Sequence, residues 1–459
     1  MRLAAPKLFP QIEAAVPAKN GNNKLSENDR AAHDWYRFVL SFPPHLVREY
    51  LDRFGVTPGS RVLDPFCGTG TTLVECKKLG IPSVGVEANP VACFASRVKT
   101  DWGVDPDGLL AHAQAVSERV RKKLAASGVG DGDDLVPGAR ISPTLLTLPE
   151  ESVKLLLRNS ISPLPLHKTL LLLDDLRRHA DESFRQIELL ALAKALVGPV
   201  GNLHFGPEVG VGKIKADAPV VQCWLDNVAA MVRDLRGLAA RKDVFADLHC
   251  ADSRLLLEAL EPQSVDAVIT SPPYPNEKDY TRTTRLESVL LGFIHSRAEL
   301  REFKQALVRS NTRNVYKGDT DDEWIEGHPE IARIAAAIEA RRIELGKTSG
   351  FERLYARVTK LYFGGMARHL ADLRTILRPG AQLAYVVGDQ ASYLRVMIRT
   401  GQLLAQIAEG LGYELVGIDL FRTRLATATR QQLREEVVLL RWPGSSKKTL
   451  SCKRSPRRF

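Results

Sequence analysis

The segment that best indicates the fold runs from Val62 to Glu75 and reads VLDPFCGTGTTLVE. A short apolar run ends in Asp64, Gly68 and Gly70 follow, and a helical pattern begins at Thr71. Glycines let the backbone approach a ligand closely, and the helix N-terminus behind them favours an anionic group. The stretch therefore predicts a strand, a ligand-binding turn and a helix, although a glycine pair alone is also compatible with a plain tight turn.

The chain outward from this stretch repeats the alternation of strand and helix. A second strand is predicted at Val84 to Glu87, followed by a helix over 91–99. Further strands are predicted at 244–248, 265–269, 382–387, 413–420 and 436–442, with helices at 353–377 and about 393–411. The last two strands leave no room for a helix between them, so we expect an antiparallel pair. The pattern predicts an α/β fold with a seven-stranded, doubly wound, Rossmann-like sheet.

Two long interruptions in the alternation predict inserted, mainly helical segments. The expected organisation is an N-terminal arm (1–32), a cofactor-binding half (33–103), a first insertion (104–243), a catalytic half (244–297), a second insertion (298–350), the remainder of the sheet domain (351–443) and a basic tail (444–459).

Composition indicates an ordinary globular protein with an excess of positive charge. The 459 residues are 44% hydrophobic and 26% charged, with a formal net charge of +10. This charge suggests a polyanionic partner without identifying it. Six basic residues lie in the last fifteen, SSKKTLSCKRSPRRF, which predicts a solvated tail or a phosphate-binding one. No apolar run approaches the length of a membrane span, and no signal peptide is apparent.

Six cysteines are scattered along the chain without a CxxC pair or a histidine at metal-ligand spacing. This spacing argues against a zinc site and against a disulfide framework. We therefore expect no metal and a reduced, cytoplasmic compartment.

Acidic residues follow three of the predicted strands. Asp64 ends the first strand, Glu87 ends the second, and Asp252 follows the third. An acid at the position of Glu87 typically holds the ribose hydroxyls of a nucleoside-containing cofactor. Each acid alone could instead cap a helix, but three at successive strand ends favour a cofactor site.

Three segments together resemble the amino-group DNA methyltransferases that use S-adenosylmethionine. They are DPFCGTGTT (64–72), VGVEANP (84–90) and TSPPY (270–274). The matching segments cover roughly half of the chain. By this resemblance, the methionine part of the cofactor would be lined by Phe66, Gly68, Gly70 and Thr71, with Phe42 in the similar segment FPPHLV. Glu87 would bind the ribose and Asp252 would contact the adenine.

The tetrapeptide Ser271-Pro272-Pro273-Tyr274 has a chemical rationale in such an enzyme. An exocyclic amine of a base is a poor nucleophile because its lone pair is delocalised into the ring. Hydrogen-bond acceptors aimed at the amine stabilise the nitrogen as it attacks the methyl group, and Ser271 Oγ with the Pro272 carbonyl can supply them. Tyr274 can stack on a base flipped out of the duplex.

Ser-Pro-Pro-Tyr in this family usually accompanies methylation of cytosine N4, so the resemblance implies site-specific cytosine-N4 DNA methylation, in restriction-modification or epigenetic marking. An adenine-N6 DNA methyltransferase is the nearest alternative. An RNA or protein amide methyltransferase and a non-catalytic DNA-binding protein are more distant ones. The implied setting is the nucleoid of a bacterium or archaeon, with double-stranded DNA as partner and a separate restriction endonuclease as a further partner that the sequence leaves open.

Six basic residues are candidates for contact with DNA. The two insertions are the candidate recognition regions, because little chain follows the last strand. The candidates are Arg282 and Arg285 after the tetrapeptide, Lys213 and Lys215 in a glycine-rich segment of the first insertion, and Arg309 and Arg313 in the second insertion. A surface hairpin at 201–215 and plain helix-surface charges at 282 and 285 are the structural alternatives.

Overall fold

The protein is described by a computed structural model that covers residues 25–37, 41–132, 144–205, 209–276, 278–425 and 432–444. The basic tail and most of the predicted N-terminal arm lie outside these described residues. Within them, no helix is long and apolar enough to cross a membrane.

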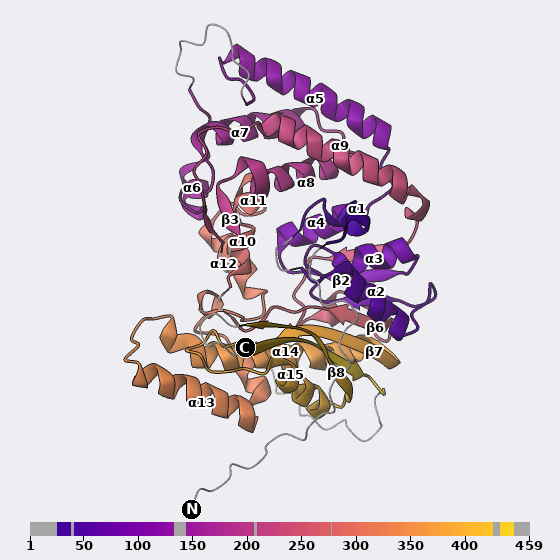
Figure 1. Ribbon diagram of the computed structural model, residues 1–459, viewed down its shortest axis with the longest axis vertical. Coiled ribbons are helices and arrows are strands. Elements are labelled where there is room, and N and C mark those ends of the chain that lie inside the picture. The colour runs from indigo at the N-terminus through magenta and orange to yellow at the C-terminus, as the bar shows by residue number, and fades with distance from the viewer. Residues whose placement is uncertain are drawn as a thin grey trace, which may run out of the picture.

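A seven-stranded sheet organises the fold, with the strand order β5-β2-β1-β6-β7-β9-β8 (Figure 1). Its strands are β1 (Val62–Asp64), β2 (Ser83–Val86), β5 (Ala246–His249), β6 (Val265–Thr270), β7 (Leu377–Gly388), β8 (Glu414–Leu425) and β9 (Gln432–Arg441). The first five pair in parallel, and β9 runs antiparallel to both β7 and β8. The predicted α/β fold, its seven strands and the antiparallel closing pair are confirmed.

The glycine turn after β1 forms because only glycine fits there. Gly70 adopts a φ of 82°, and a Cβ at this position would lie 2.4 Å from Ser96 Oγ. Helix α3 (Thr71–Leu79) starts at the next residue, as the sequence predicts. The turn therefore carries the chain from the sheet edge directly into a helix N-terminus.

Helices cover both faces of the sheet. On one face, α2 (Pro44–Arg53) and α3 contribute to an apolar cluster with alternate residues of β1, β6, β7 and β9. On the other, α14 (Tyr355–Ile376) and α15 (Thr400–Gly410) pack on the remaining residues of these strands. The two-sided burial explains why the central strands read as continuous apolar runs.

The first insertion forms a helical lobe that continues from α4 (Pro90–Thr100), at the top of Figure 1. Its helices are α5 (Pro106–Ala126), α6 (Glu150–Leu155), α7 (Pro163–Arg178), α8 (Arg185–Ala195) and α9 (Val220–Leu238). All but α6 share a core with α4 around the fully buried Trp102 and Trp224, whereas Leu155 of α6 packs with Val289 and Ile294. The glycine-rich segment contains the short antiparallel pair β3 (Leu203–Phe205) and β4 (Val209–Val211), so the hairpin alternative holds there.

The second insertion lies between the catalytic half and α14. It contains α12 (Arg297–Gln305) and α13 (Pro329–Glu344), and α13 packs against α14 through Ile331, Ile334 and Ile338. The short helices α10 (Tyr280–Thr283) and α11 (Arg285–Leu290) precede it.

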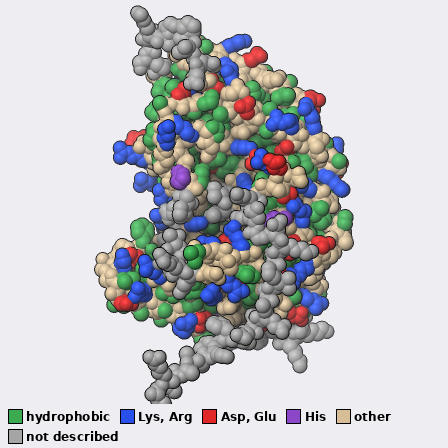
Figure 2. Space-filling model, in the orientation of Figure 1, with side chains coloured by type: hydrophobic (Ala, Val, Ile, Leu, Met, Phe, Trp, Pro, Cys, Tyr) green, Lys and Arg blue, Asp and Glu red, His purple; other side chains and the backbone are tan. Residues whose placement is uncertain are grey.

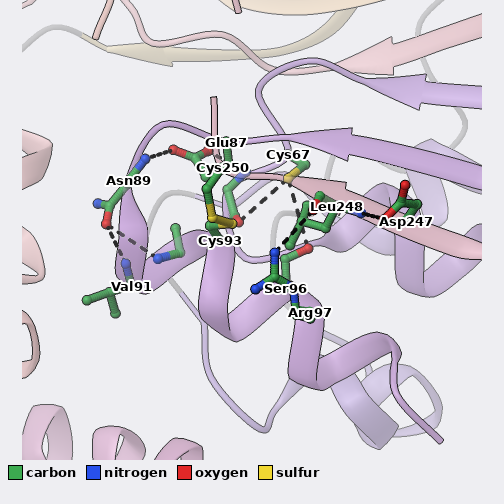
Figure 3. Close-up of a disulfide and its surroundings, with 12 residues drawn as sticks. Cys67, Glu87, Asn89, Val91, Cys93, Ser96, Arg97, Asp247, Leu248 and Cys250 are labelled. Carbon is green, nitrogen blue, oxygen red and sulfur yellow. Dashed lines mark hydrogen bonds between the residues drawn. A yellow bond between two sulfur atoms is a disulfide. The ribbon is translucent and has the colours of Figure 1, made fainter. Parts of the chain in front are cut away.

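Cys93 and Cys250 are joined by a disulfide, which corrects the expectation that the cysteines would not pair (Figure 3). The two residues are 157 positions apart, so their spacing gave no signal. They meet because β5 lies beside β2, with His249 opposite Val86, which brings the end of β5 next to α4. Cys250 is exposed whereas Cys93 is fully buried.

Candidate active site

A cavity of about 670 Å³ opens at the carboxyl ends of the parallel strands. The predicted residues that line it are Phe42, Phe66, Gly68, Thr71, Glu87 and all four residues of Ser271-Pro272-Pro273-Tyr274. The cofactor residues and the tetrapeptide, predicted from separate motifs, therefore face one continuous space. Its volume lies within the range of about 300–1,000 Å³ typical of ligand pockets.

Glu87 closes the glycine turn from the end of β2. Its carboxylate accepts hydrogen bonds from the backbone N–H groups of Gly68, at 2.8 Å, and Asn89, at 2.7 Å. Burial raises the pKa of Glu87 to about 7. The two hydrogen bonds oppose this rise because they favour the ionised form. The remaining lone pairs of this carboxylate can accept hydrogen bonds from hydroxyl groups of a bound nucleoside.

Asp64 lies beneath the cavity and does not line it. Its hydrogen bonds hold the glycine turn in place. Its carboxylate accepts hydrogen bonds from Thr270 Oγ1 at 2.6 Å, Thr72 Oγ1 at 2.7 Å and the Phe66 N–H at 3.1 Å. Complete burial raises the pKa of Asp64 to about 6. Since Thr270 ends β6 and Thr72 lies in the first turn of α3, Asp64 ties the glycine turn to the strand that carries the tetrapeptide.

Phe66 is held in place by a buried histidine. The Phe66 and His369 rings meet edge to face at 4.8 Å, and the two ring nitrogens of His369 contact the Ser253 carbonyl and the Tyr385 hydroxyl, each at 2.7 Å. Burial lowers the pKa of His369 to about 4, so it is neutral at physiological pH. Ser253 and Phe66 both line the cavity.

Asp252, predicted to contact adenine, is engaged with a residue of its own loop. It forms an ion pair with Arg254 at 2.6 Å, and Arg254 also pairs with Asp321 of the second insertion at 2.5 Å. The neighbouring Ser253 lines the cavity, whereas Asp252 does not. An adenine contact by Asp252 stays a prediction, and its structural role here is to join the β5 loop to the second insertion.

The tetrapeptide extends from β6 into the cavity. Ser271 Oγ donates a hydrogen bond of 3.1 Å to the carbonyl oxygen of Val386 in the neighbouring strand β7. The Tyr274 ring packs against Gly388, where a Cβ would lie 3.0 Å from the ring. Burial raises the pKa of Tyr274, so its phenol is neutral, and the hydroxyl group also forms a hydrogen bond with Ser271.

The structure separates the predicted DNA contacts into engaged and exposed residues. Arg309 is buried and pairs with Asp319 at 2.9 Å, and Lys215 Nζ donates to three backbone carbonyls at 2.6–3.2 Å. Arg285 donates to the carbonyls of residues 281 and 155. These three residues therefore support the fold, while Lys213 and Arg313 are exposed and Arg282 is half-buried.

Sequence reasoning missed much of the far wall of the cavity. This wall is formed by Asn276, Lys278 and Tyr280 after the tetrapeptide, by Ser310 and Asn314 of the second insertion, by Gln390 and Ser392 after β7, and by Arg422, Arg424 and Glu435 of the last two strands. The residues just after the tetrapeptide had a sequence signal, namely their proximity to it, and Asn314 had one as a residue type that reads base edges. The second insertion thus borders the cavity through Ser310 and Asn314, while its contact with a target strand stays a prediction.

No group of three or more histidine, cysteine or acidic side chains is arranged for a metal ion among the described residues. The donor set instead suits S-adenosylmethionine: a hydroxyl-accepting carboxylate at Glu87, an open glycine turn, and the rings of Phe42 and Phe66.

Comparisons with known proteins find similar DNA methyltransferases. Residues 15–97 match the family model described as DNA methylase, of the N6 and N4 type. The Type II methyltransferase M.BsoBI of Geobacillus stearothermophilus is 24% identical over 92% of this chain and 87% of its own length. The Type II methyltransferase M.AvaI of Nostoc sp. is 23% identical over 91% of this chain and 88% of its own length.

Among solved structures, the rRNA methyltransferase aviRa from Streptomyces viridochromogenes covers 93% of this chain at 11% identity, with a TM-score of 0.34, too low to carry an inference. The family model and the two Type II relatives together support an amino-group DNA methyltransferase, without distinguishing the N4 from the N6 type.

Proposed function

We propose that this protein is a site-specific DNA methyltransferase that transfers a methyl group from S-adenosylmethionine to N4 of a flipped-out cytosine in double-stranded DNA. The observation that carries the proposal is the single cavity shared by Glu87, the glycine turn and the tetrapeptide. The similarity to Type II methyltransferases supports a role in restriction-modification. A cytoplasmic location and a separate endonuclease partner belong to the same proposal.

Residues along the cavity would have separate roles in cofactor binding and methyl transfer. When bound, S-adenosylmethionine supplies an electrophilic methyl group on a sulfonium sulfur. Glu87 accepts hydrogen bonds from the ribose, and Phe66 packs against the cofactor from a position that His369 fixes. These contacts would orient the reacting centre toward the tetrapeptide. Such orientation of the reactants contributes to catalysis.

Ser271 and Pro272 would act on the target amine. Because the Ser271 hydroxyl proton is donated to Val386, its oxygen is left to accept a hydrogen bond from the amine. The rigid prolines hold the Pro272 carbonyl as the second acceptor. Both acceptors would hold the amine hydrogens while the nitrogen takes the methyl group from the sulfonium sulfur, and the proton that the amine then releases would pass to solvent.

Tyr274 would hold the flipped base by stacking. Its ring is supported from behind by Gly388, so it presents one face to the cavity. Stacking tolerates cytosine or adenine alike, and the preference for cytosine rests on the serine at position 271. Adenine N6 is therefore the alternative target of the same arrangement.

Transfer of tritiated methyl groups from S-adenosylmethionine to DNA tests the proposal. Genomic DNA from a methylation-free bacterium is compared with total RNA, using the wild-type chain and Tyr274→Ala, with Tyr274→Phe as a matched control that keeps the ring. We expect incorporation into DNA with the wild type and Tyr274→Phe, and much less with Tyr274→Ala. Label in RNA alone would overturn the proposal.

A further inference from the structure

A group of three basic residues lies beside the catalytic tyrosine and is not explained by the fold. Lys278 follows the tetrapeptide, and Arg422 and Arg424 project from β8. All three line the cavity on its base side, together with Glu435 of β9. We refer to Lys278, Arg422 and Arg424 as the basic rim.

The position of the basic rim is fixed by contacts around Gly388. A Cβ on this residue would meet the Tyr274 ring at 3.0 Å and Glu435 Cγ at 3.5 Å, so Tyr274 and Glu435 flank the same point of β7. Glu435 pairs with Arg422 at 2.5 Å and with Arg424 at 3.5 Å. The two arginines are therefore immediate neighbours of the place where the target base would stack.

Charges within this group do not balance. Glu435 faces three cations, while the next acids on the same elements are engaged elsewhere: Asp389 with Arg399 and Glu436 with Arg434. Arg422 takes the close contact with Glu435. Arg424 has two long contacts, each of 3.5 Å, with a carboxylate oxygen of Glu435 and with the Asp389 carbonyl oxygen. The Lys278 ammonium interacts electrostatically with Arg424 and Glu435.

Two cations held near each other in a partly buried wall repel, and an anion bound between them relieves the repulsion. The side chains of Arg422 and Arg424 are 31% and 43% exposed, so such an anion can reach them from solvent. Figure 2 shows Lys and Arg side chains spread over both lobes of one face, so general surface charge does not single out this point. Its place in the catalytic cavity does.

We propose that Lys278, Arg422 and Arg424 form a phosphate clamp that grips the target strand beside the flipped nucleotide. A nucleotide leaves the duplex by rotation about its own backbone, so its flanking phosphodiesters come to the mouth of the base pocket. Guanidinium groups bind phosphate oxygens through paired N–H donors, and an ammonium adds a point charge. This inference rests on the proposed function and replaces Arg285, which the fold engages, as a phosphate contact of that strand.

The test compares two double variants of the full chain that each remove two cations. Lys278→Gln/Arg424→Gln removes the two less engaged cations of the clamp. Arg378→Gln/Arg441→Gln is the matched control, because both arginines form exposed ion pairs at the opposite end of the same sheet, with Asp266 and Glu414. Arg424→Lys keeps the charge and serves as the conservative variant. Unfolding temperature and S-adenosylmethionine affinity of every variant establish that the fold and the cofactor site are intact.

Binding and transfer are measured separately on genomic DNA fragments from a methylation-free host, between 50 and 200 mM KCl. We expect the clamp variant to raise the Kd and KM for DNA by a larger factor than it lowers kcat at saturating DNA. Its slope of log affinity against log salt falls by about 0.9 for each lost phosphate contact. The control double variant and Arg424→Lys keep the wild-type slope.

Two results would count against the two proposals in different ways. A clamp variant with wild-type DNA affinity and salt slope overturns the clamp and leaves the methyltransferase proposal intact. A wild-type chain that binds DNA without transferring methyl groups overturns the proposed function instead, whatever the clamp variant does.

Discussion

The hydroxyl group of Ser271 donates a hydrogen bond of 3.1 Å to the backbone carbonyl of Val386. This contact ties the first residue of the tetrapeptide to the adjacent strand β7 and commits the hydroxyl proton. The oxygen then has only acceptor capacity left for a ligand. The relationship leaves the Ser271 oxygen as a hydrogen-bond acceptor in the wall of the cavity.

Replacing Ser271 with alanine removes this acceptor, and we expect kcat to fall by about 10²–10³-fold, the usual effect of losing one positioned group that stabilises developing charge. Affinity for S-adenosylmethionine, measured by calorimetry, stays unchanged because Ser271 is on the base side. Ser349→Ala on an exposed loop is the control. Wild-type turnover in Ser271→Ala would contradict the role of the serine as acceptor.

Cofactor binding is expected to depend on pH through Glu87. Its pKa is raised to about 7, and ribose hydroxyls donate hydrogen bonds to the ionised carboxylate. The association constant therefore rises about tenfold per pH unit below 7 and levels off above it, with a proton released on binding at low pH. Calorimetry at pH 5.5, 6.5 and 7.5 measures this. Glu87→Gln binds more weakly and without the slope; an equal slope in Glu87→Gln would assign the effect to another group.

Asp64→Asn tests the anchor beneath the turn. The folded-state pKa of Asp64 lies above the unfolded value of 3.8, so its contribution to stability is full below that value and is lost as pH rises through about 6. We expect the stability of wild type relative to Asp64→Asn to fall by about 2 kcal/mol between pH 4 and 7. Urea unfolding of both proteins at the two pH values provides the free energies. A difference independent of pH would show that Asp64 does not titrate in this range.

The Cys93–Cys250 disulfide should change the number of cysteines that can be alkylated before and after reduction. Alkylation under denaturing conditions should add two fewer labels to the unreduced protein than to the reduced one, as measured by intact mass. Loss of the bond in Cys93→Ser/Cys250→Ser should lower stability by about 2–4 kcal/mol. Equal labelling before and after reduction would mean that the two thiols are not joined.

Local patterns predicted the strands and the cofactor turn because their signals lie within short segments. The apolar run before Asp64, the glycines and the helix start at Thr71 each follow from nearby sequence, and the structure has α3 over the predicted residues. The tetrapeptide was placed correctly at the end of a buried strand for the same reason.

Contacts between distant segments could not be predicted in this way. Cys250 reaches Cys93 only because β5 pairs with β2, and Arg422 reaches the cavity only because β8 lies at the end of the sheet beyond β9. Arg309 was expected at the surface from its residue type, but Asp319 ten residues later pairs with it inside the second insertion. Residue type indicates what a side chain can bind, while the tertiary fold decides whether it is free to do so.

Nucleoside analysis tests the central claim most directly. DNA from a methylation-free bacterial host that expresses this chain is digested and examined by mass spectrometry, beside a host that expresses Ser271→Ala. Sequencing of the same DNA locates the modified positions. We predict N4-methylcytosine at one sequence motif with the wild type and little or none with the variant. DNA without any methylated amine, from a host that contains the folded protein, would contradict the proposed function.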